Sequence, residues 1–273
     1  MPRPPGVAFR LDVALEDADQ ALATLSDLGT TGMQELDNDG GAVRWIVFFP
    51  EASAELERSL ARLGTLAPYP IPDVDWVARF RENFTGFDAG GFRVEPEWNR
   101  DAAPAGPRTL IVDPGQAFGT GTHETTRLCL AALVAAAEAR PLGRLLDLGT
   151  GSGILAIAAE RLGATLAVGI DFDPDAVISA RKHVQLNASR VHLAVGDLAR
   201  PLRARFDTVI ANLMAPLLVE RRLEIQRTCA PSGRLILSGL LRDDLPLIRS
   251  HFGTQSAETT DGEWAAVAFG GVA

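Results

Sequence analysis

The chain has 273 residues, of which 47% are hydrophobic and 22% are charged, as in an ordinary globular protein. Its net charge of −9 argues against a broad nucleic-acid surface, which requires a basic face, and permits attraction to a basic protein partner. No stretch of 18 uncharged apolar residues and no apolar leader occurs, so we expect a cytoplasmic protein without a membrane span or a signal peptide. Because of the acidic net charge, we also expect no direct nucleic-acid site.

Residues 1–64 predict a small α+β domain with a ferredoxin-like organisation. Residues 7–15 alternate like a strand, and the helix that follows has leucines at helical spacing and ends at Gly29. Two strands flank the turn sequence DNDGG, and a second helix begins at Ser53 and ends at Gly64. This stretch holds 11 acidic and 5 basic side chains, which fits either a solubilising surface or a site for a basic partner.

Residues 65–107 predict a linker with one short helix. The segment starts with the proline-rich sequence APYPIP, which favours an extended chain. The sequence DWVARFRENF then predicts a helix with Trp76 and Phe80 on one face, and we expect both to pack between domains. The loop DAAPAGP at 101–107 ends the linker and places a domain boundary here.

Residues 108–273 predict a doubly wound, mostly parallel sheet. Compact apolar strands alternate with helices, which is the pattern of successive βαβ units. The chain closes with a helix and a β-hairpin around the turn DGE, which predicts one antiparallel strand in the sheet. The apolar strands are expected at 144–149, 165–171, 191–197, 206–213 and 233–239.

The first turn of this sheet carries the glycine sequence DLGTGSG. It is not a phosphate loop, because no lysine follows it, and a dinucleotide site would need glycine where Ile154 stands. Its glycines are Gly149, Gly151 and Gly153, and Asp147 precedes them at the end of a strand. This arrangement resembles motif I of S-adenosylmethionine-dependent methyltransferases.

Polar residues follow the next three strands, where ligands of such sheets bind. Asp171 can accept hydrogen bonds from ribose hydroxyls, whereas Asp173 is the better candidate for a helix cap. Asp197 fits a contact to an adenine amino group and a helix cap equally well. Asn212 could tie down a loop, but beside the other motifs we favour a functional role.

A second loop, GQAFGTGTHETT at 115–126, lies just upstream of the sheet. It fits neither a phosphate loop nor a metal site, because the other histidines lack ligand spacing around His123. We expect His123 to fix the turn by a hydrogen bond to the backbone, with a role as a base as the alternative. Phe118 could stack on the adenine or pack on the next helix. The loop is therefore predicted to cover a bound cofactor and to contact it through Thr126.

Four segments agree in order and spacing with one known family. They are AFGTGTHETT (117–126), DLGTGSGILAIAA (147–159), GIDFDP (169–174) and IANL (210–213). Together they resemble the ribosomal protein L11 methyltransferase family, and the upstream loop is the most specific of the four. The resemblance implies a seven-stranded class I methyltransferase domain at 108–273, a linker at 65–107 and a substrate-recognition domain at 1–64.

The resemblance also implies residue roles and a reaction. S-adenosylmethionine would be bound by Thr126, Gly149, Asp171 and Asn212, and Phe118, Gly151 and Asp197 complete the expected cofactor site, with no metal. The implied reaction methylates lysine ε-amines and the N-terminal α-amine of free ribosomal protein L11, releases S-adenosylhomocysteine, and uses the N-terminal domain to hold the substrate. Two positions depart from the family: Glu124 replaces a common proline, and the turn after Asn212 lacks a common glycine.

The expected chemistry needs an aligned acceptor more than it needs a general base. A free lysine has a pKa of about 10.4, and desolvation beside a sulfonium charge favours its neutral form. We therefore expect the Asn212 oxygen to orient the amine, with no obligatory general base. The alternatives are a lysine methyltransferase of another protein and a non-catalytic module that binds S-adenosylmethionine; the acidic charge disfavours a nucleic-acid methyltransferase.

Overall fold

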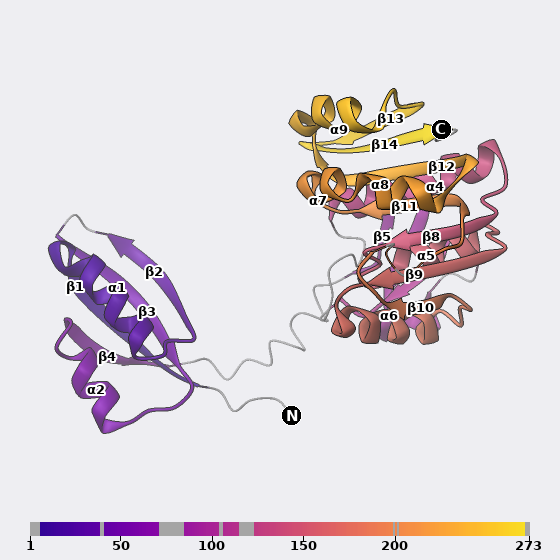
Figure 1. Cartoon of the computed structure of the whole chain (residues 1–273). Helices are drawn as coiled ribbons and strands as arrows, with labels where there is room; N and C mark the ends of the chain where they lie inside the picture. Colours follow the sequence, from indigo (N-terminus) through magenta and orange to yellow (C-terminus); the bar gives the residue numbers. More distant parts are fainter. Residues whose placement is uncertain are drawn as a thin grey trace. The chain divides into compact units, whose positions relative to one another are not determined.

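The computed structural model divides the chain into two compact units, Met1–Arg79 and Phe80–Ala273 (Figure 1). It describes residues 6–38, 41–70, 85–103, 106–114, 123–198, 200 and 202–270. Trp76, Phe80 and Phe118 lie outside the described residues, and so does most of the upstream glycine-threonine loop. Within the described part, no helix is both long and apolar enough to cross a bilayer. Cys129 and Cys229 are buried free thiols.

The first unit is a four-stranded antiparallel sheet with two helices, in the β-α-β-β-α-β order of a ferredoxin-like fold. The strand order is β2-β3-β1-β4, and this confirms the predicted fold. Its elements are β1 (Val7–Ala14), η1 (Leu15–Asp17), α1 (Ala18–Asp27), β2 (Gly32–Asn38), β3 (Ala42–Phe49), α2 (Ala54–Leu60) and β4 (Thr65–Tyr69).

The core of this unit follows from alternation along β1 and β3. Leu11 of β1 and Val47 of β3 are fully buried, and Leu25 of α1 and Leu60 of α2 close over them. Ser53 caps α2 as predicted, because its hydroxyl accepts a hydrogen bond from the backbone of the first turn at 3.0 Å.

Strand β4 extends the first sheet beyond Gly64, into the expected linker. Its Leu66 lies opposite Leu11 of β1 in antiparallel register. Pro68 lies in the same strand, and proline is tolerated there because β4 is an edge strand that pairs only with β1. The first proline of the expected linker therefore stands in a short edge strand.

The second unit is built on a seven-stranded sheet of order β10-β9-β8-β11-β12-β14-β13, which runs from bottom to top in Figure 1. Among the described strands of this sheet, β14 alone runs opposite to the rest, as the closing hairpin predicts, and the class I methyltransferase topology is confirmed. The strands are β8 (Arg144–Leu148), β9 (Leu166–Asp171), β10 (His192–Val195), β11 (Phe206–Asn212), β12 (Cys229–Leu241), β13 (Ala257–Asp261) and β14 (Trp264–Gly270).

Helices cover both faces of this sheet. One buried cluster joins one face to α4 and α5 with α6 beside them, and another joins the opposite face to α7, α8 and α9. The helical segment after β11 is divided at Arg221 into α7 and α8. The helices are α4 (Glu124–Ala139), α5 (Ile154–Arg161), α6 (Pro174–Leu186), α7 (Ala215–Glu220), α8 (Arg222–Thr228) and α9 (Leu245–Phe252), with η3 (Arg242–Asp244) before the last.

A small third sheet occupies part of the expected linker. Strands β5 (Phe87–Ala89), β6 (Phe92–Pro96) and β7 (Thr109–Val112) form it in sequence order, and η2 (Glu97–Ala102) follows β6. Phe92 and Leu110 are buried in the same core cluster as α4 and α5. Burial of these apolar side chains therefore places 87–103 with the second unit, so the structure divides the predicted 65–107 linker between the two units.

Candidate active site

A cleft of about 770 Å³ opens at the carboxyl ends of β8, β9 and β11. Ligands of open α/β sheets bind at such strand ends. Gly149, Gly151, Asp171 and Asn212 all line this cleft, so the structure brings these four predicted site residues together. They come from the ends of three strands, and they lie together because these parallel strands end at the same edge of the sheet.

The glycine turn between β8 and α5 adopts a conformation that side chains rarely tolerate. Gly149, Gly151 and Gly153 have φ angles of 70°, 53° and 78°. A Cβ on Gly149 would lie 2.5 Å from Cδ2 of Leu213, so that side chain would have to turn aside to make room. The amide of Gly149 donates to the carbonyl of Ile170 at 2.9 Å, which fixes the turn against β9.

Asp147 holds this turn from inside the core. Its carboxylate is completely buried, and Oδ2 accepts a hydrogen bond from Oγ1 of Thr150 at 2.6 Å. Burial raises the pKa of Asp147 to about 7, and the bond from Thr150 opposes that shift. Asp147 therefore stabilises the glycine turn from within the core, and it does not line the cleft.

Asp171 joins the end of β9 to the glycine turn. Its Oδ2 accepts the amide hydrogen of Gly151 at 2.8 Å, and its Oδ1 accepts that of Asp173 at 3.0 Å. Asp173 caps α6 by accepting from the amide of Asp175, which confirms the predicted cap. Each oxygen of Asp171 can accept a further hydrogen bond, so this cleft residue can still hold the hydroxyls of a ligand.

Asn212 ends β11 with its amide group fixed in place. Its Nδ2 lies 3.3 Å from Oγ1 of Thr125, and that hydroxyl lies 2.9 Å from Nδ1 of His123. The Oδ1 of Asn212 is buried and accepts no hydrogen bond from the residues that the structure describes. An unsatisfied buried acceptor costs about 1–3 kcal/mol, so this oxygen marks where a hydrogen-bond donor fits.

At the start of α4, the neighbouring residues Thr125 and Thr126 have different surroundings. Thr125 contacts Asn212, whereas Thr126 is 1% exposed and its hydroxyl has no hydrogen-bond partner in the described part of the chain. His123 caps α4, because its Nδ1 accepts the amide hydrogen of Thr125 at 3.3 Å, and the edge of its ring meets Trp264. The expected contact of His123 with the backbone is confirmed, whereas sequence reasoning did not single out Thr125.

Asp197 lines a smaller hollow of about 380 Å³ that shares Gly149 and Asp171 with the cleft. Its two oxygens accept from Nη2 of Arg221 at 2.8 and 3.0 Å, and Arg200 pairs with it at 2.7 Å. Among the described residues no helix begins between Asp197 and α7, so the helix-cap alternative is wrong. The carboxylate is instead held by two arginines at the rim of this hollow.

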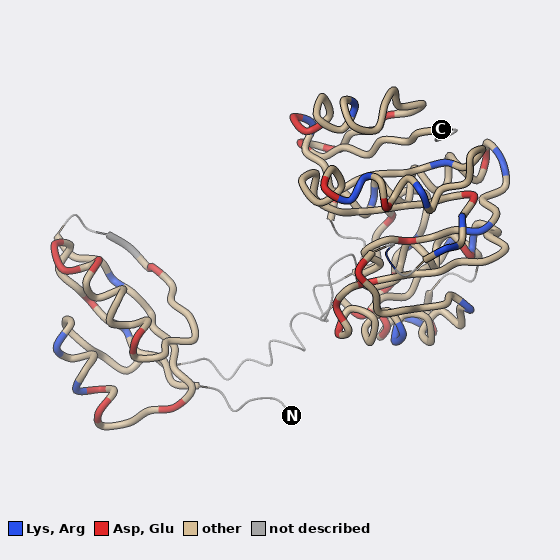
Figure 2. Tube along the Cα trace, in the orientation of Figure 1, with Lys and Arg blue, Asp and Glu red and all other residues tan. Residues whose placement is uncertain are grey.

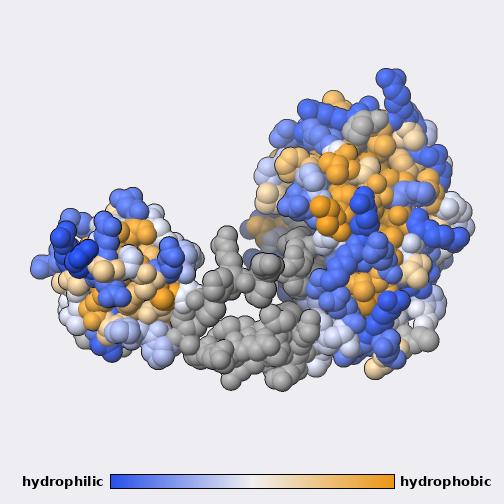
Figure 3. Space-filling model, turned by 90° about the horizontal axis from the view of Figure 1, so that it is seen from below, coloured by the Kyte–Doolittle hydropathy of each residue, from blue (hydrophilic) through white to orange (hydrophobic). Residues whose placement is uncertain are grey.

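Two further cleft residues carry no signal in the sequence motifs. Asp113 follows β7, and its Oδ2 lies 2.5 Å from Nζ of Lys182 on α6. Lys182 is the single lysine of the chain, and it also pairs with Glu97 at 2.9 Å. Phe172, at the smaller hollow, and Ile178, in the cleft, have exposed apolar side chains. Figure 3 shows hydrophobic surface on the second unit.

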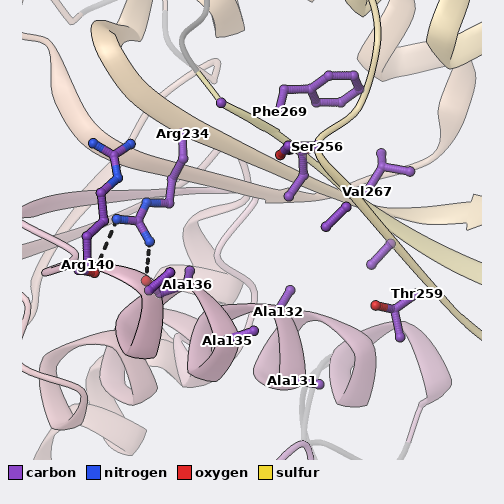
Figure 4. Close-up of a pocket in the computed structure, with 15 residues that line it drawn as sticks. Ala131, Ala132, Ala135, Ala136, Arg140, Arg234, Ser256, Thr259, Val267 and Phe269 are labelled. Atoms are coloured by element: carbon purple, nitrogen blue, oxygen red, sulfur yellow. Dashed lines mark hydrogen bonds between the residues drawn. The ribbon is translucent and has the colours of Figure 1, made fainter.

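A separate apolar hollow of about 540 Å³ lies between α4 and the hairpin β13–β14 (Figure 4). Alanines of α4 and residues such as Val267 and Phe269 line it. Arg234 closes one end by donating to the carbonyls of Ala136 and Arg140 near the end of α4. None of the predicted site residues lines this hollow. Elsewhere in the described ranges, too, no cluster of three acidic, histidine or cysteine side chains could hold a metal.

Known proteins resemble the chain over most of its length. The sequence profile of the ribosomal protein L11 methyltransferase family (PrmA) matches residues 49–270. A ribosomal protein L11 methyltransferase of Geobacter sulfurreducens is 40% identical over 87% of this chain and 84% of its own. One of Thermus thermophilus is 36% identical over 96% of this chain and 98% of its own. The solved ribosomal protein L11 methylase of Lactobacillus delbrueckii superposes with a TM-score of 0.62 at 28% identity, covering 68% of this chain and 97% of that one.

Proposed function

The chain belongs to the ribosomal protein L11 methyltransferase family, and we propose that it transfers methyl groups from S-adenosylmethionine to amine nitrogens of ribosomal protein L11 in the cytoplasm. One observation carries the proposal for the site. Asn212, whose buried Oδ1 accepts no hydrogen bond from the described residues, lines one cleft together with a glycine turn and an acidic strand end. This arrangement suits a reaction in which the methyl donor and the acceptor amine must be aligned in line.

The residues present fit S-adenosylmethionine. The exposed backbone at Gly149 and Gly151 allows close approach of the ligand, and Asp171 retains acceptor capacity for two ribose hydroxyls. We assign the adenine to the smaller hollow beside Phe172 and Asp197. S-adenosylmethionine supplies, when bound, a methyl group on a sulfonium, and S-adenosylhomocysteine is the product.

Asn212 orients the acceptor nitrogen. Its Oδ1 accepts one N–H of the amine, while the bond from Nδ2 to Thr125 prevents the amide from turning. The nitrogen lone pair forms the new N–C bond as the C–S bond breaks, and the extra N–H proton leaves to solvent. Since an amide takes up no proton, Asn212 positions the amine without acting as a base, and desolvation keeps the amine neutral.

Thr126 has a place in this proposal because its hydroxyl is unsatisfied. It lies one residue after Thr125, on the first turn of α4, and it is buried without a partner among the described residues. A cofactor group that reached this hydroxyl would satisfy it. We keep Thr126 as a cofactor contact on that ground.

The N-terminal unit is proposed to hold the protein substrate. It folds as a separate ferredoxin-like unit with its own core, and none of its described residues lines the cleft. Residues 1–64 carry 11 acidic and 5 basic side chains, and acidic residues lie along the described part of this unit in Figure 2. Such a surface suits a basic protein, and ribosomal proteins are commonly basic.

The variant Asn212→Ala tests the proposed role of the site. We expect turnover to fall by about a hundredfold, since an orienting contact made in the transition state is lost. Binding of S-adenosylmethionine, measured by calorimetry, should weaken by about threefold or less, as expected for a residue that acts mainly on the acceptor. Full turnover in this variant would remove Asn212 from the mechanism.

A further inference from the structure

The C-terminal end of α6 binds the edge of β7 through a side-chain amide. Asn187, which follows α6, accepts the amide hydrogen of Ile111 at 2.8 Å and donates to the carbonyl of the same residue at 2.7 Å. These are the two bonds that a neighbouring strand would make, and β7 is an edge strand of its sheet. Asn187 is 4% exposed, so this contact is shielded from water.

His183 makes the next bond along the same chain segment. Its Nε2 accepts the amide hydrogen of Asp113 at 3.0 Å, and its Nδ1 lies 2.9 Å from the carbonyl of Ser179. A carbonyl only accepts and an amide only donates, so Nδ1 carries the proton and the ring is neutral. The side chain is 1% exposed, and burial lowers the pKa of His183 below its ordinary value.

The charged groups around His183 belong to three elements. Asp113 follows β7, Glu97 lies in η2, and Lys182 of α6 pairs with both carboxylates at 2.5 and 2.9 Å. The carboxylates favour a charged ring and Lys182 opposes it, while burial is the largest influence and keeps the ring neutral. The positive charge of the cluster is therefore already supplied by Lys182.

Helix α6 links the cluster around His183 to Asp171, the carboxylate that is proposed to bind the cofactor. Helix α6 begins at Pro174, directly after the cap Asp173 and close to Asp171. Its other end holds Asp113, which lines the same cleft as Asp171. The two ends of α6 therefore fix two walls of one cleft.

We propose that His183 and Asn187 are positioning residues that hold Asp113 in the wall of the cofactor cleft, and that protonation of His183 releases this wall and weakens cofactor binding. The inference rests on the proposed function, since the cleft is taken to bind S-adenosylmethionine. Protonation would place an N–H of the ring against the amide hydrogen of Asp113, two donors with no acceptor between them. It would also add a second positive charge beside Lys182.

The test is a calorimetric titration of the full chain with S-adenosylmethionine at about pH 8 and about pH 5; the lower value lies well below the ordinary histidine pKa because burial lowers the pKa of His183. We expect the wild type to bind about tenfold more weakly at the lower pH, and His183→Gln, whose amide accepts a hydrogen bond without titrating, to change by about twofold or less. His192→Gln is the matched control, because His192 is an exposed histidine on β10 and should keep the wild-type dependence.

The outcomes separate the two proposals. No binding by the wild type at about pH 8 would remove the proposed function, whereas binding with the same pH dependence in His183→Gln would remove this inference alone. Any contribution of Asp147, whose pKa is about 7, is present in both proteins and cancels in the comparison. If His183→Gln does not fold, nitrogen NMR of the wild type decides: the pKa of His183 should fall when S-adenosylmethionine is added, and an unchanged pKa contradicts the proposal.

Discussion

Nδ2 of Asn212 lies 3.3 Å from Oγ1 of Thr125, which joins the end of β11 to the first turn of α4. This contact bridges 87 residues of sequence, and it determines which way the Asn212 amide faces. With Nδ2 engaged, Oδ1 is left as a buried acceptor without a partner among the described residues. The bond therefore connects the upstream loop segment with the proposed orienting residue.

Replacing Thr125 by valine should lower turnover without weakening the fold much. Thr125→Val keeps the shape of the side chain and removes the oxygen that holds Nδ2 of Asn212. We expect kcat to fall by about tenfold and KM for S-adenosylmethionine to stay within about twofold, because positioning of the acceptor is lost. Steady-state kinetics with a fixed protein acceptor measure both constants.

Thr126→Val should give the opposite pattern. The buried hydroxyl of Thr126 has no partner among the described residues, so its removal should leave the melting temperature unchanged or raise it. If the hydroxyl contacts the cofactor as proposed, KM for S-adenosylmethionine should rise by about fivefold or more. An unchanged KM would show that Thr126 is only a core residue.

Gly149→Ala should weaken cofactor binding because of its backbone conformation and because the Leu213 side chain, which also lines the cleft, would have to shift. The residue has a φ of 70°, and an added Cβ would meet Leu213 at 2.5 Å. We expect a loss of about 1–3 kcal/mol in the free energy of unfolding, together with at least about tenfold weaker binding of S-adenosylmethionine. Gly163→Ala is the control, since Gly163 has a φ of 90° with nothing within 4 Å, and it should lose stability but keep affinity.

The buried carboxyl of Asp147 should make stability fall as pH rises. Burial raises its pKa to about 7 from 3.8, so between these values the folded protein binds more protons than the unfolded chain. The contribution of this group is therefore most favourable below about pH 4 and declines until about pH 7. Asp147→Asn keeps an acceptor for Thr150 and should remove the decline.

Urea unfolding of both proteins at about pH 5 and about pH 8 measures this effect. The advantage of Asp147→Asn over the wild type in free energy of unfolding should grow by roughly 2 kcal/mol from the lower to the higher pH. A difference that is equal at the two pH values would show that the carboxyl does not titrate in this window.

Much of the fold could be predicted because the central strands are apolar runs between helices. β8 and β11 bury most of their side chains and β9 buries half of its own, and their apolar composition is visible in the sequence. β4 escaped prediction because Pro68 is unusual in strands, although an edge strand tolerates it. Strand β5, with three residues, is too short to show a period.

The site was predictable where it depends on strand ends, and not where it depends on contacts between distant elements. Gly149, Asp171 and Asn212 each lie at the end of a strand and line one cleft. In contrast, the bond between His183 and Asp113 spans 70 residues and joins a helix to a strand that sequence reasoning did not assign. No local pattern marks such a pair, because only the packing of α6 on β7 creates it.

The central claim is that this chain methylates amines of ribosomal protein L11. The most direct measurement incubates the pure full-length protein with labelled S-adenosylmethionine and a ribosomal protein mixture from cells that lack the enzyme, with Asn212→Ala as the control. Mass spectrometry should then show methyl groups on lysine and N-terminal amines of ribosomal protein L11 with the wild type, and few or none with the variant. Label on RNA alone, or on proteins other than L11 alone, would contradict the claim.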